Sequence, residues 1–337
     1  MDGTLIHDVF TVRSGGPPSG GASTEVAITH PASIQAPILP AMIEAAELGR
    51  RARRLAAANE PVIGQVYFSP ECHREYEALG FRASPGTTGG VALPDGPAYF
   101  TSRGSALGQV SGELIASAFA VFNPAVVVRC VDLGWSLTDA ATIAAARTRG
   151  AAGQLTRILG EHPEGLERAT ELLRRAVAPL RVEGRPLYAG TLALGWPDES
   201  MADLFHAGDL LREYRGDCHT ASWITAGFDA TEIGLLSELF LGIPLRTYVR
   251  SRAWSGGELD AALERLAARD LVVDGAFTEA GRAAREDVER ATDAQMRPAI
   301  ETLGDDFDAL VAILEPWGQA IRAAGGYLTS AAQLMGS

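Results

Sequence analysis

The feature that most constrains the fold is an ordered series of segments between residues 229 and 295. Apolar residues recur there at helical spacing, and the breaks between the periodic stretches predict helices at 229–242, 244–253, 255–270 and 278–295. The intervening stretch LVVDGAF has room for only two very short strands, and its Asp274-Gly275 pair is typical of a type I′ hairpin turn. The series predicts a small domain of packed helices with one minimal β-hairpin.

Most of the remaining sequence has helical periodicity as well. It predicts further helices at 38–58, 60–81, 110–122, 124–133, 138–160, 163–181, 198–215, 217–226 and 306–324. Residues 82–104 carry many Gly and Pro and predict a long loop or a short hairpin. Gly216 should permit a sharp turn between two helices. The predicted fold class is mainly α, with an N-terminal helical domain at 37–195 that follows a flexible arm at 1–36.

Composition limits the classes of function. With 47% hydrophobic and 21% charged residues, the 337-residue chain has the make-up of a globular protein with a real core. A net charge of −13 argues against extensive neutralisation of nucleic-acid phosphates. All 29 basic residues are arginine, which excludes a Schiff-base lysine and a P-loop lysine. The absence of lysine, with abundant Ala and Gly, points to a high-GC actinobacterial genome.

The sequence also bears on location. Cys72, Cys130 and Cys218 are odd in number and far apart, a pattern that fits reduced thiols better than a disulfide framework. No run approaches the roughly 18 uncharged apolar residues of a transmembrane helix. The N-terminal residues lack the basic and apolar regions of a secretory signal. We therefore expect a cytoplasmic protein without a membrane partner.

Two resemblances follow from these segments. The helix ending in AARDLV, the tiny hairpin and the following TEAGR resemble the winged-helix domain of MarR-type regulators, in which 255–270 would be the recognition helix. This MarR-like domain would occupy 196–337. A longer stretch, about 40–325, resembles an uncharacterised actinobacterial helix-turn-helix family through Tyr67-Phe68, GRPLY, Trp-Pro and a histidine followed by LLRE-(H/Y)-RGD-x-H. The resemblance implies a winged helix-turn-helix fold with a minimal β-wing, and no particular activity.

The expected recognition helix and wing bear on DNA binding. Residues 255–270 contain four acidic residues and two arginines, and the wing sequence VDGA has no basic residue to enter a minor groove. The candidate phosphate contacts are Arg246, Arg250 and Arg252, for which solvated surface is the alternative interpretation. Binding to DNA is therefore the less favoured hypothesis.

The stretch HAGDLLREYRGDCH at 206–219 concentrates ionisable groups at the expected junction of two helices. Asp217 would cap the second helix, and His219 in its first turn would stay neutral, which suits a general base. Candidate catalytic residues are His206, Asp217 and His219, and candidate ligand contacts are Tyr67, Glu213 and Arg215. The alternative for the whole cluster is a structural staple between the two helices.

These observations favour a small-molecule-binding protein on a MarR-like scaffold, whose polar pocket at 206–219 takes an anionic or aromatic molecule. Acid–base catalysis in specialised metabolism is a candidate extension of that function. One alternative is a ligand-responsive DNA-binding regulator. Another is a metal-dependent enzyme that uses His206, His219 and a carboxylate, although the sequence has no HExxH or CxxC motif and no cofactor is predicted. The helices at 278–295 and 306–324 are candidates for a homodimer interface.

Overall fold

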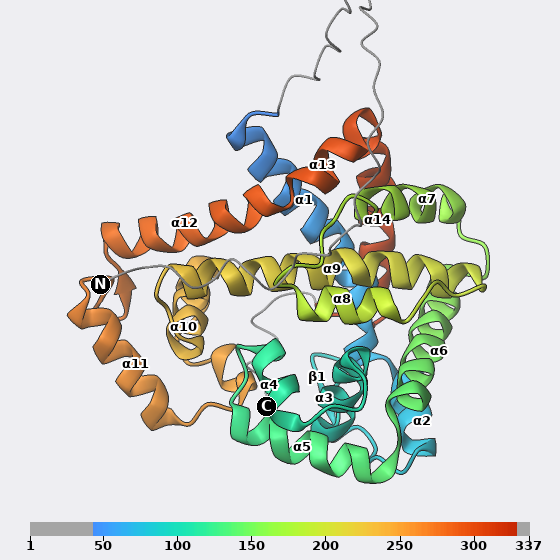
Figure 1. Cartoon of the computed structure of the whole chain (residues 1–337), viewed down its shortest axis with the longest axis horizontal. Coiled ribbons are helices and arrows are strands. Elements are labelled where there is room, and N and C mark those ends of the chain that lie inside the picture. The colour runs from blue at the N-terminus through green and yellow to red at the C-terminus, as the bar shows by residue number, and fades with distance from the viewer. Residues whose placement is uncertain (1–42, 329–337) are drawn as a thin grey trace, which may run out of the picture. The chain divides into compact units, whose positions relative to one another are not determined.

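The computed structural model describes residues 43–328 and consists mainly of α-helices, which confirms the expected fold class (Figure 1). The flexible arm expected at 1–36 lies outside the described residues. The helices are α1 (Ala45–Gly64), α2 (Pro70–Ala78), α3 (Gly96–Gly104), α4 (Gly112–Phe119), α5 (Pro124–Leu137), α6 (Ala140–Leu159), α7 (Leu166–Val177), α8 (Pro186–Ala193), α9 (Ser200–Thr225), α10 (Ala230–Leu241), α11 (Gly256–Ala268), α12 (Glu279–Gln295), α13 (Arg297–Leu303) and α14 (Phe307–Ala323). Two antiparallel hairpins consist of β1 (Thr87–Thr88) with β2 (Val91–Ala92), and β3 (Val272–Val273) with β4 (Ala276–Phe277).

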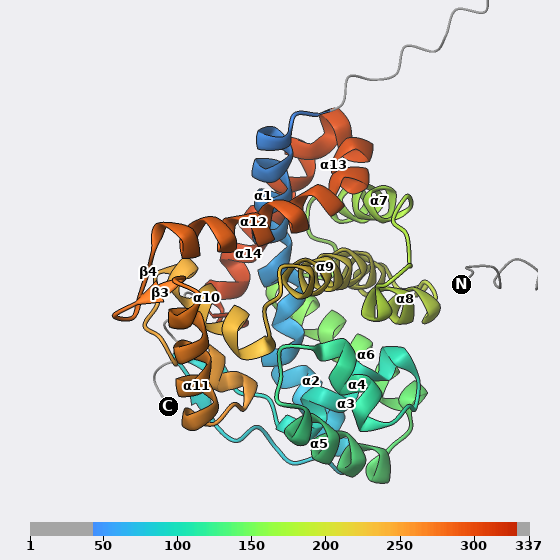
Figure 2. The ribbon, with the colours of Figure 1, turned by 60° about the vertical axis from the view of Figure 1, so that its left-hand side comes forward.

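Helix α9 runs through the middle of the described residues, as Figures 1 and 2 show. It packs against α1, α6, α7, α8 and α12, and the largest hydrophobic core includes its side chains Leu204, Phe205 and Leu210. Helix α1 lies along α14, so the first and last of the described helices contribute to the same core. None of the described helices is long and apolar enough to cross a membrane.

Helices α10, α11 and α12 and the hairpin of β3 and β4 form the segment that resembles a winged helix (Figure 2). Local sequence sets its boundaries, because Asp229 and Ser255 each begin a helix with a reciprocal capping box. Asp274 and Gly275 both have positive φ, as a type I′ turn requires. The short helix expected at 244–253 is only a 3₁₀ turn, η3 (Val249–Arg252). Apart from that element, the predicted order of segments is confirmed.

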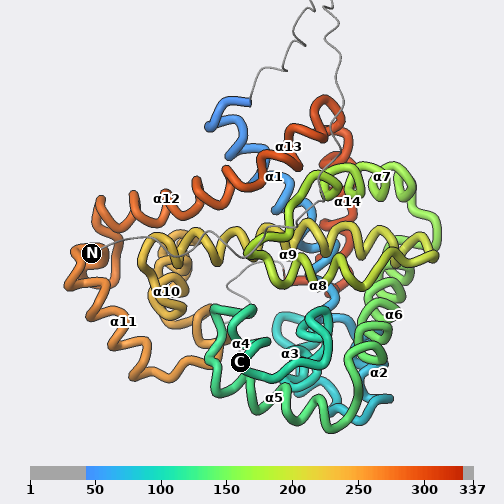
Figure 3. The backbone as a smooth tube through the Cα atoms, viewed as in Figure 1, coloured from blue at the N-terminus to red at the C-terminus, as the bar shows by residue number. Residues whose placement is uncertain are grey.

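The helix junction expected at Gly216 is wrong, because α9 continues through it without a break (Figure 3). Glycine inside a helix costs about 1 kcal/mol relative to alanine, and packing of α9 against several neighbours outweighs that preference. Asp217 is therefore an interior residue rather than a helix cap, and His219 lies outside any first turn. His219 follows His206 by thirteen positions. At 1.5 Å per residue they lie about 20 Å apart along the helix axis.

The Gly- and Pro-rich region at 82–104 contains more structure than its composition predicts. Strands β1 and β2 form a short hairpin, one of the two forms expected, and α3 follows it directly. Asp95 caps α3 by accepting a hydrogen bond from the backbone N–H of Ala98, and Pro97 occupies the first turn. Helices α8 and α13 also form where no helix is predicted. Helix α3 matters for function because it carries Arg103.

Candidate functional site

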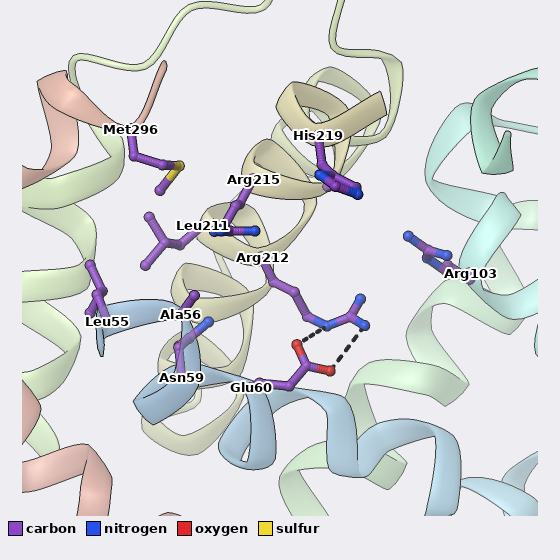
Figure 4. Close-up of a pocket in the computed structure, with 11 residues that line it drawn as sticks. Leu55, Ala56, Asn59, Glu60, Arg103, Leu211, Arg212, Arg215, His219 and Met296 are labelled. Carbon is purple, nitrogen blue, oxygen red and sulfur yellow. Dashed lines mark hydrogen bonds and ion pairs between the residues drawn. The ribbon is translucent and has the colours of Figure 1, made fainter. Parts of the chain in front are cut away.

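A cavity with two chambers lies along one face of α9. The α1 chamber has a volume of about 310 Å³ and lies between α9 and α1 (Figure 4). The α10 chamber has a volume of about 220 Å³ and is lined by residues of α3, α4, α9, α10 and η3. The residues that line both chambers are Arg103, Arg212, Gly216 and His219. The two chambers therefore meet at these side chains.

Gly216 lies at the centre of the α9 face that borders the cavity. At 100° per residue, Arg212, Arg215, Asp217 and His219 all project within about 100° of it. Gly216 is exposed, although most residues of α9 around it are buried or half-buried. A Cβ atom added there would meet no atom closer than Oε2 of Glu213, at 3.9 Å. The glycine therefore leaves open space among ionisable side chains.

Arg103 enters the cavity from α3 and faces α9 (Figure 4). Its Nε and Nη2 donate to the carboxylate of Glu213 at 3.0 and 2.7 Å, and its guanidinium carbon lies 4.7 Å from the centre of the Phe119 ring. Burial raises the pKa of Glu213, but the charges of Arg103 and Arg212 outweigh burial and lower this pKa to about 2. Glu213 lines neither chamber. It is an ionised partner that positions Arg103.

Arg212 is held in place from several sides. Its Nε and Nη2 donate to Glu60 at 2.9 and 3.2 Å, as Figure 4 shows, and its Nη1 donates to the hydroxyl of Tyr67 at 3.1 Å and to Glu213 at 3.2 Å. Burial raises the pKa of Tyr67 to about 12, so Tyr67 remains a neutral phenol. Tyr67 lines neither chamber. The structure therefore places it behind Arg212.

Arg215 and His219 lie on the side of α9 that faces α12. Nη2 of Arg215 donates to Glu289 at 3.1 Å and to Asp293 at 3.2 Å. Nδ1 of His219 lies 3.2 Å from Oγ1 of Thr292. Burial lowers the pKa of His219 to about 4, although the Glu289 carboxylate acts in the opposite direction. His219 is therefore a neutral imidazole near pH 7.

Asp217 is buried and lines the α10 chamber. Its Oδ2 accepts a hydrogen bond at 3.0 Å from the backbone N–H of Tyr188 in the first turn of α8. Asp217 therefore satisfies the N-terminus of α8 from the interior of α9, and it does not cap a helix that begins after Gly216. Burial, assisted by the charge of Glu213, raises the pKa of Asp217 to about 7. The carboxyl group therefore changes its charge near neutral pH, beside the cavity.

The structure separates His206 from the other candidate residues. His206 is buried, and its ring meets that of Trp196 edge-on at 4.9 Å between centroids. Burial lowers its pKa. A metal site that uses both His206 and His219 is wrong, because the two residues lie too far apart on one rigid helix. Among residues 43–328, no group of three or more His, Cys, Asp or Glu side chains has an arrangement that could hold a metal ion.

The three arginines proposed for DNA contact have different surroundings. Arg246 is exposed and pairs with Asp260 of α11. Arg250 is exposed on η3. Arg252 lines the α10 chamber, where its guanidinium carbon lies 4.6 Å from the centre of the Phe122 ring. They therefore do not form one basic surface.

Three charged residues that line the cavity have no counterpart among the sequence predictions, namely Glu60, Arg103 and Arg212. Arg212 belongs to the LLRE part of the motif at 206–219, so that motif was a signal for it. Glu60 and Arg103 lie in segments without any local sign of a site. Glu60 reaches the cavity because α1 packs against α9, and Arg103 reaches it from α3, which packs against α5 and α6, by pairing with Glu213 of α9.

Comparison with known proteins gives one match. A family model described as a helix-turn-helix family matches residues 52–328. The chain therefore belongs to this helix-turn-helix family. No curated protein and no solved structure matches it.

Proposed function

We propose that this member of the helix-turn-helix family binds a small organic molecule in the α1 and α10 chambers, and that recognition of this ligand, rather than of an operator, is its main activity. Chambers of about 310 and 220 Å³ suit a small ligand. The binding residues in this proposal are Arg103, Arg212, Arg215 and His219, with Asp217 beside the α10 chamber.

One observation carries the proposal, namely the open space at Gly216 between these ionisable side chains. Burial of charged groups costs free energy, even when they are paired. A purely structural staple between helices would be expected to close this space with apolar side chains. Instead the space persists, and both chambers meet there at Arg103 and His219.

The position of the α10 chamber supports a MarR-like use of the winged-helix segment, in which the ligand touches that segment directly. This chamber is lined by Ile233 and Gly234 of α10, by Tyr248 directly before η3 and by Arg252 of η3. The opposite wall comes from α3 and α4. A bound ligand would therefore connect the helical N-terminal part with the winged-helix segment.

Acid–base catalysis is a second use of the same cavity. Asp217, whose pKa is about 7, is suited to proton transfer near neutral pH, and the neutral His219 adds a weaker base on the same cavity wall. The receptor and the enzyme differ in one measurable respect. A receptor releases its ligand unchanged, whereas an enzyme converts it, and mass spectrometry of a bound compound after prolonged incubation distinguishes them.

Family membership is the specific observation that favours DNA binding as the alternative function. The surface of α11 supports it poorly, because Arg265 pairs with Asp229 and Glu232 while Glu264 and Asp260 are exposed. In a mobility-shift assay with random duplex DNA at low salt, we expect no retention by micromolar protein. Strong retention that is lost as salt increases would support the regulator instead.

Gly216→Leu tests the ligand-binding proposal, with Gly216→Ala as the matched control. A library of small carboxylic acids and their neutral amides is screened by thermal shift, and affinities of the active compounds are measured by calorimetry. We expect the leucine side chain to fill the cavity and abolish binding, and the alanine methyl group to weaken it only a few-fold. Equal binding by Gly216→Leu and by the unaltered protein would place the ligand elsewhere and overturn the proposal.

A further inference from the structure

We propose that the cavity is specific for a monoanionic hydroxy acid with an apolar tail, in which Arg103 holds the carboxylate and Nε2 of His219 accepts a hydrogen bond from the hydroxyl group. This inference rests on the proposed ligand-binding function and adds the chemistry of the ligand. It assigns a specificity-determining role to one imidazole nitrogen. Four features of the cavity support it.

The first feature is the tautomer of His219. Oγ1 of Thr292 is fully buried and donates its proton to the carbonyl oxygen of Val288 at 2.8 Å. Lone pairs of Oγ1 then face Nδ1 of His219, 3.2 Å away, and this arrangement favours a ring proton on Nδ1. The Glu289 carboxylate, 3.9 Å from Nδ1, favours the same tautomer.

The neutral Nδ1–H tautomer leaves Nε2 with a lone pair and no proton. His219 lines both chambers, and its side chain keeps 23% of its surface exposed. The low pKa of about 4 keeps the ring in this state at neutral pH. Nε2 therefore acts as an acceptor, and it selects a ligand that carries an O–H donor.

The second feature is the donor capacity of Arg103. A guanidinium has five N–H bonds, and Glu213 takes one from Nε and one from Nη2. Within the described part of the chain, no partner uses the remaining three. The guanidinium carbon lies over the Phe119 ring and Glu213 occupies the Nε–Nη2 edge, so the Nη1–Nη2 edge is left for a carboxylate.

The third feature is the charge around this edge. Glu60 pairs with Arg212, and Glu213 pairs with both Arg212 and Arg103. Glu289 and Asp293 pair with Arg215. Carboxylates thus already balance the neighbouring arginines. These carboxylates would repel a dianion such as a phosphate monoester more strongly than a monoanion, whose one carboxylate can accept from the free N–H donors of Arg103.

The fourth feature is the wall of the α10 chamber. Apart from Arg103, Arg212, Asp217, His219 and Arg252, it consists largely of apolar and aromatic side chains, including Tyr99, Phe119, Phe122, Leu187, Ile233 and Tyr248. Since this chamber meets the α1 chamber at Arg103 and His219, a ligand with its polar head at these residues would extend an apolar tail into the α10 chamber.

Three probes that differ in one substituent test the assignment by titration calorimetry. The hydroxy acid 2-hydroxy-3-phenylpropanoate carries the donor, 3-phenylpropanoate lacks it, and 2-methoxy-3-phenylpropanoate has an acceptor in its place. We expect the hydroxy acid to bind about tenfold more tightly than 3-phenylpropanoate, and the methoxy compound to bind most weakly, because two acceptors would then face each other.

Variants of His219 separate recognition from a structural role. In His219→Phe the preference for the hydroxy acid should disappear, while 3-phenylpropanoate keeps its affinity within about twofold. In His219→Gln the amide oxygen offers an acceptor, and part of the preference should return. Long-range ¹H–¹⁵N spectra of the unaltered protein should show a neutral His219 that is protonated at Nδ1, and Thr292→Val should reduce that tautomer.

Two results would overturn the inference, namely equal binding of the hydroxy acid and 3-phenylpropanoate, or an Nε2–H tautomer. Failure of the inference is distinct from failure of the proposed function. If none of the three probes binds but another compound gives a thermal shift that Gly216→Leu abolishes, the hydroxy-acid assignment fails and the ligand-binding function stands. If no compound gives such a shift, the proposed function fails as well.

Discussion

The two halves of α9 contain the same types of residue and use them in opposite ways. Each half has a histidine, a glycine and an acidic residue that pairs with an arginine. Around Gly208 the helix is tightly packed, and an added Cβ atom would lie only 2.4 Å from Cδ1 of Ile63. Around Gly216 the nearest atom to an added Cβ lies at 3.9 Å. The difference shows that residue type alone does not identify a site, whereas the space around the residues does.

The ion pairs of the two halves differ in the same way. Asp209 in the first half pairs with Arg147 at 2.8 Å, and both side chains are buried. In the second half, Arg103 pairs with Glu213 but keeps donors for the cavity. We therefore assign a structural role to the Asp209–Arg147 pair and a ligand-binding role to the Arg103–Glu213 pair. Three predictions test this division.

The largest effect is expected from Asp209→Asn, which removes the charge of a buried pair. Arg147 would then keep a buried charge without its partner, so we expect a loss of about 3–5 kcal/mol in the free energy of unfolding. Denaturant unfolding measures it. Asp203→Asn is the matched control, because Asp203 lies on the same helix and pairs with the half-exposed Arg174. That change should cost less than about 1 kcal/mol.

A small loss for Asp209→Asn, similar to that of the control, would contradict the division. The pair would then contribute little to the fold, and the first half of α9 would need another explanation for its buried charges. The same variant should leave ligand binding by the folded protein unchanged, since neither Asp209 nor Arg147 lines the α1 or α10 chamber.

Local signals explain which parts of this structure are predictable from sequence. Capping boxes at Asp229 and Ser255 and the turn at Asp274-Gly275 depend on residues a few positions apart, so the order of helices and hairpin between residues 229 and 295 could be predicted. The turn predicted at Gly216 does not form, because the helix penalty of one glycine is smaller than the free energy gained by burying the side chains of α9. The domain boundary at residue 196, the homodimer and the cytoplasmic location stay predictions.

The site was only partly predictable for a related reason. The motif at 206–219 includes Arg215, Asp217 and His219, which border the cavity, but it also includes His206, which a regular helix carries about 20 Å away. Arg103 lies more than a hundred positions earlier, at the end of a helix that the sequence did not reveal. No local pattern indicates that Arg103 of α3 pairs with Glu213 of α9.

The second effect in size is the pH dependence that Asp217 confers on stability. Burial raises its folded-state pKa to about 7, above the ordinary value of 3.8. At a pH between these two values, Asp217 is protonated in the folded protein and ionised in the unfolded chain. Its contribution to the free energy of unfolding therefore falls as pH rises, by about 1.4 kcal/mol per pH unit, and is lost above pH 7.

The measurement is the difference in unfolding free energy between the unaltered protein and Asp217→Asn at pH 5, 6, 7 and 8. The difference cancels the opposite trend of His219, whose lowered pKa makes stability rise with pH over part of this range. We expect the unaltered protein to lose stability relative to the variant up to about pH 7 and no further. A difference that is constant with pH would show that Asp217 is already ionised at pH 5.

The smallest effects, and the most direct comparison, come from Gly208→Ala and Gly216→Ala. The two changes are chemically identical and lie on one helix. At Gly208 the methyl group would collide with Ile63 and approach Asn59, so we expect a loss of about 1–3 kcal/mol from overpacking. At Gly216 the methyl group would enter open space, and the better helix propensity of alanine should raise the free energy of unfolding by about 0.5–1 kcal/mol.

Denaturant unfolding of both variants measures the two changes in the free energy of unfolding, which should have opposite signs. If Gly216→Ala is as destabilising as Gly208→Ala, the space at Gly216 is filled in solution by neighbouring side chains, and the two halves of α9 are equivalent.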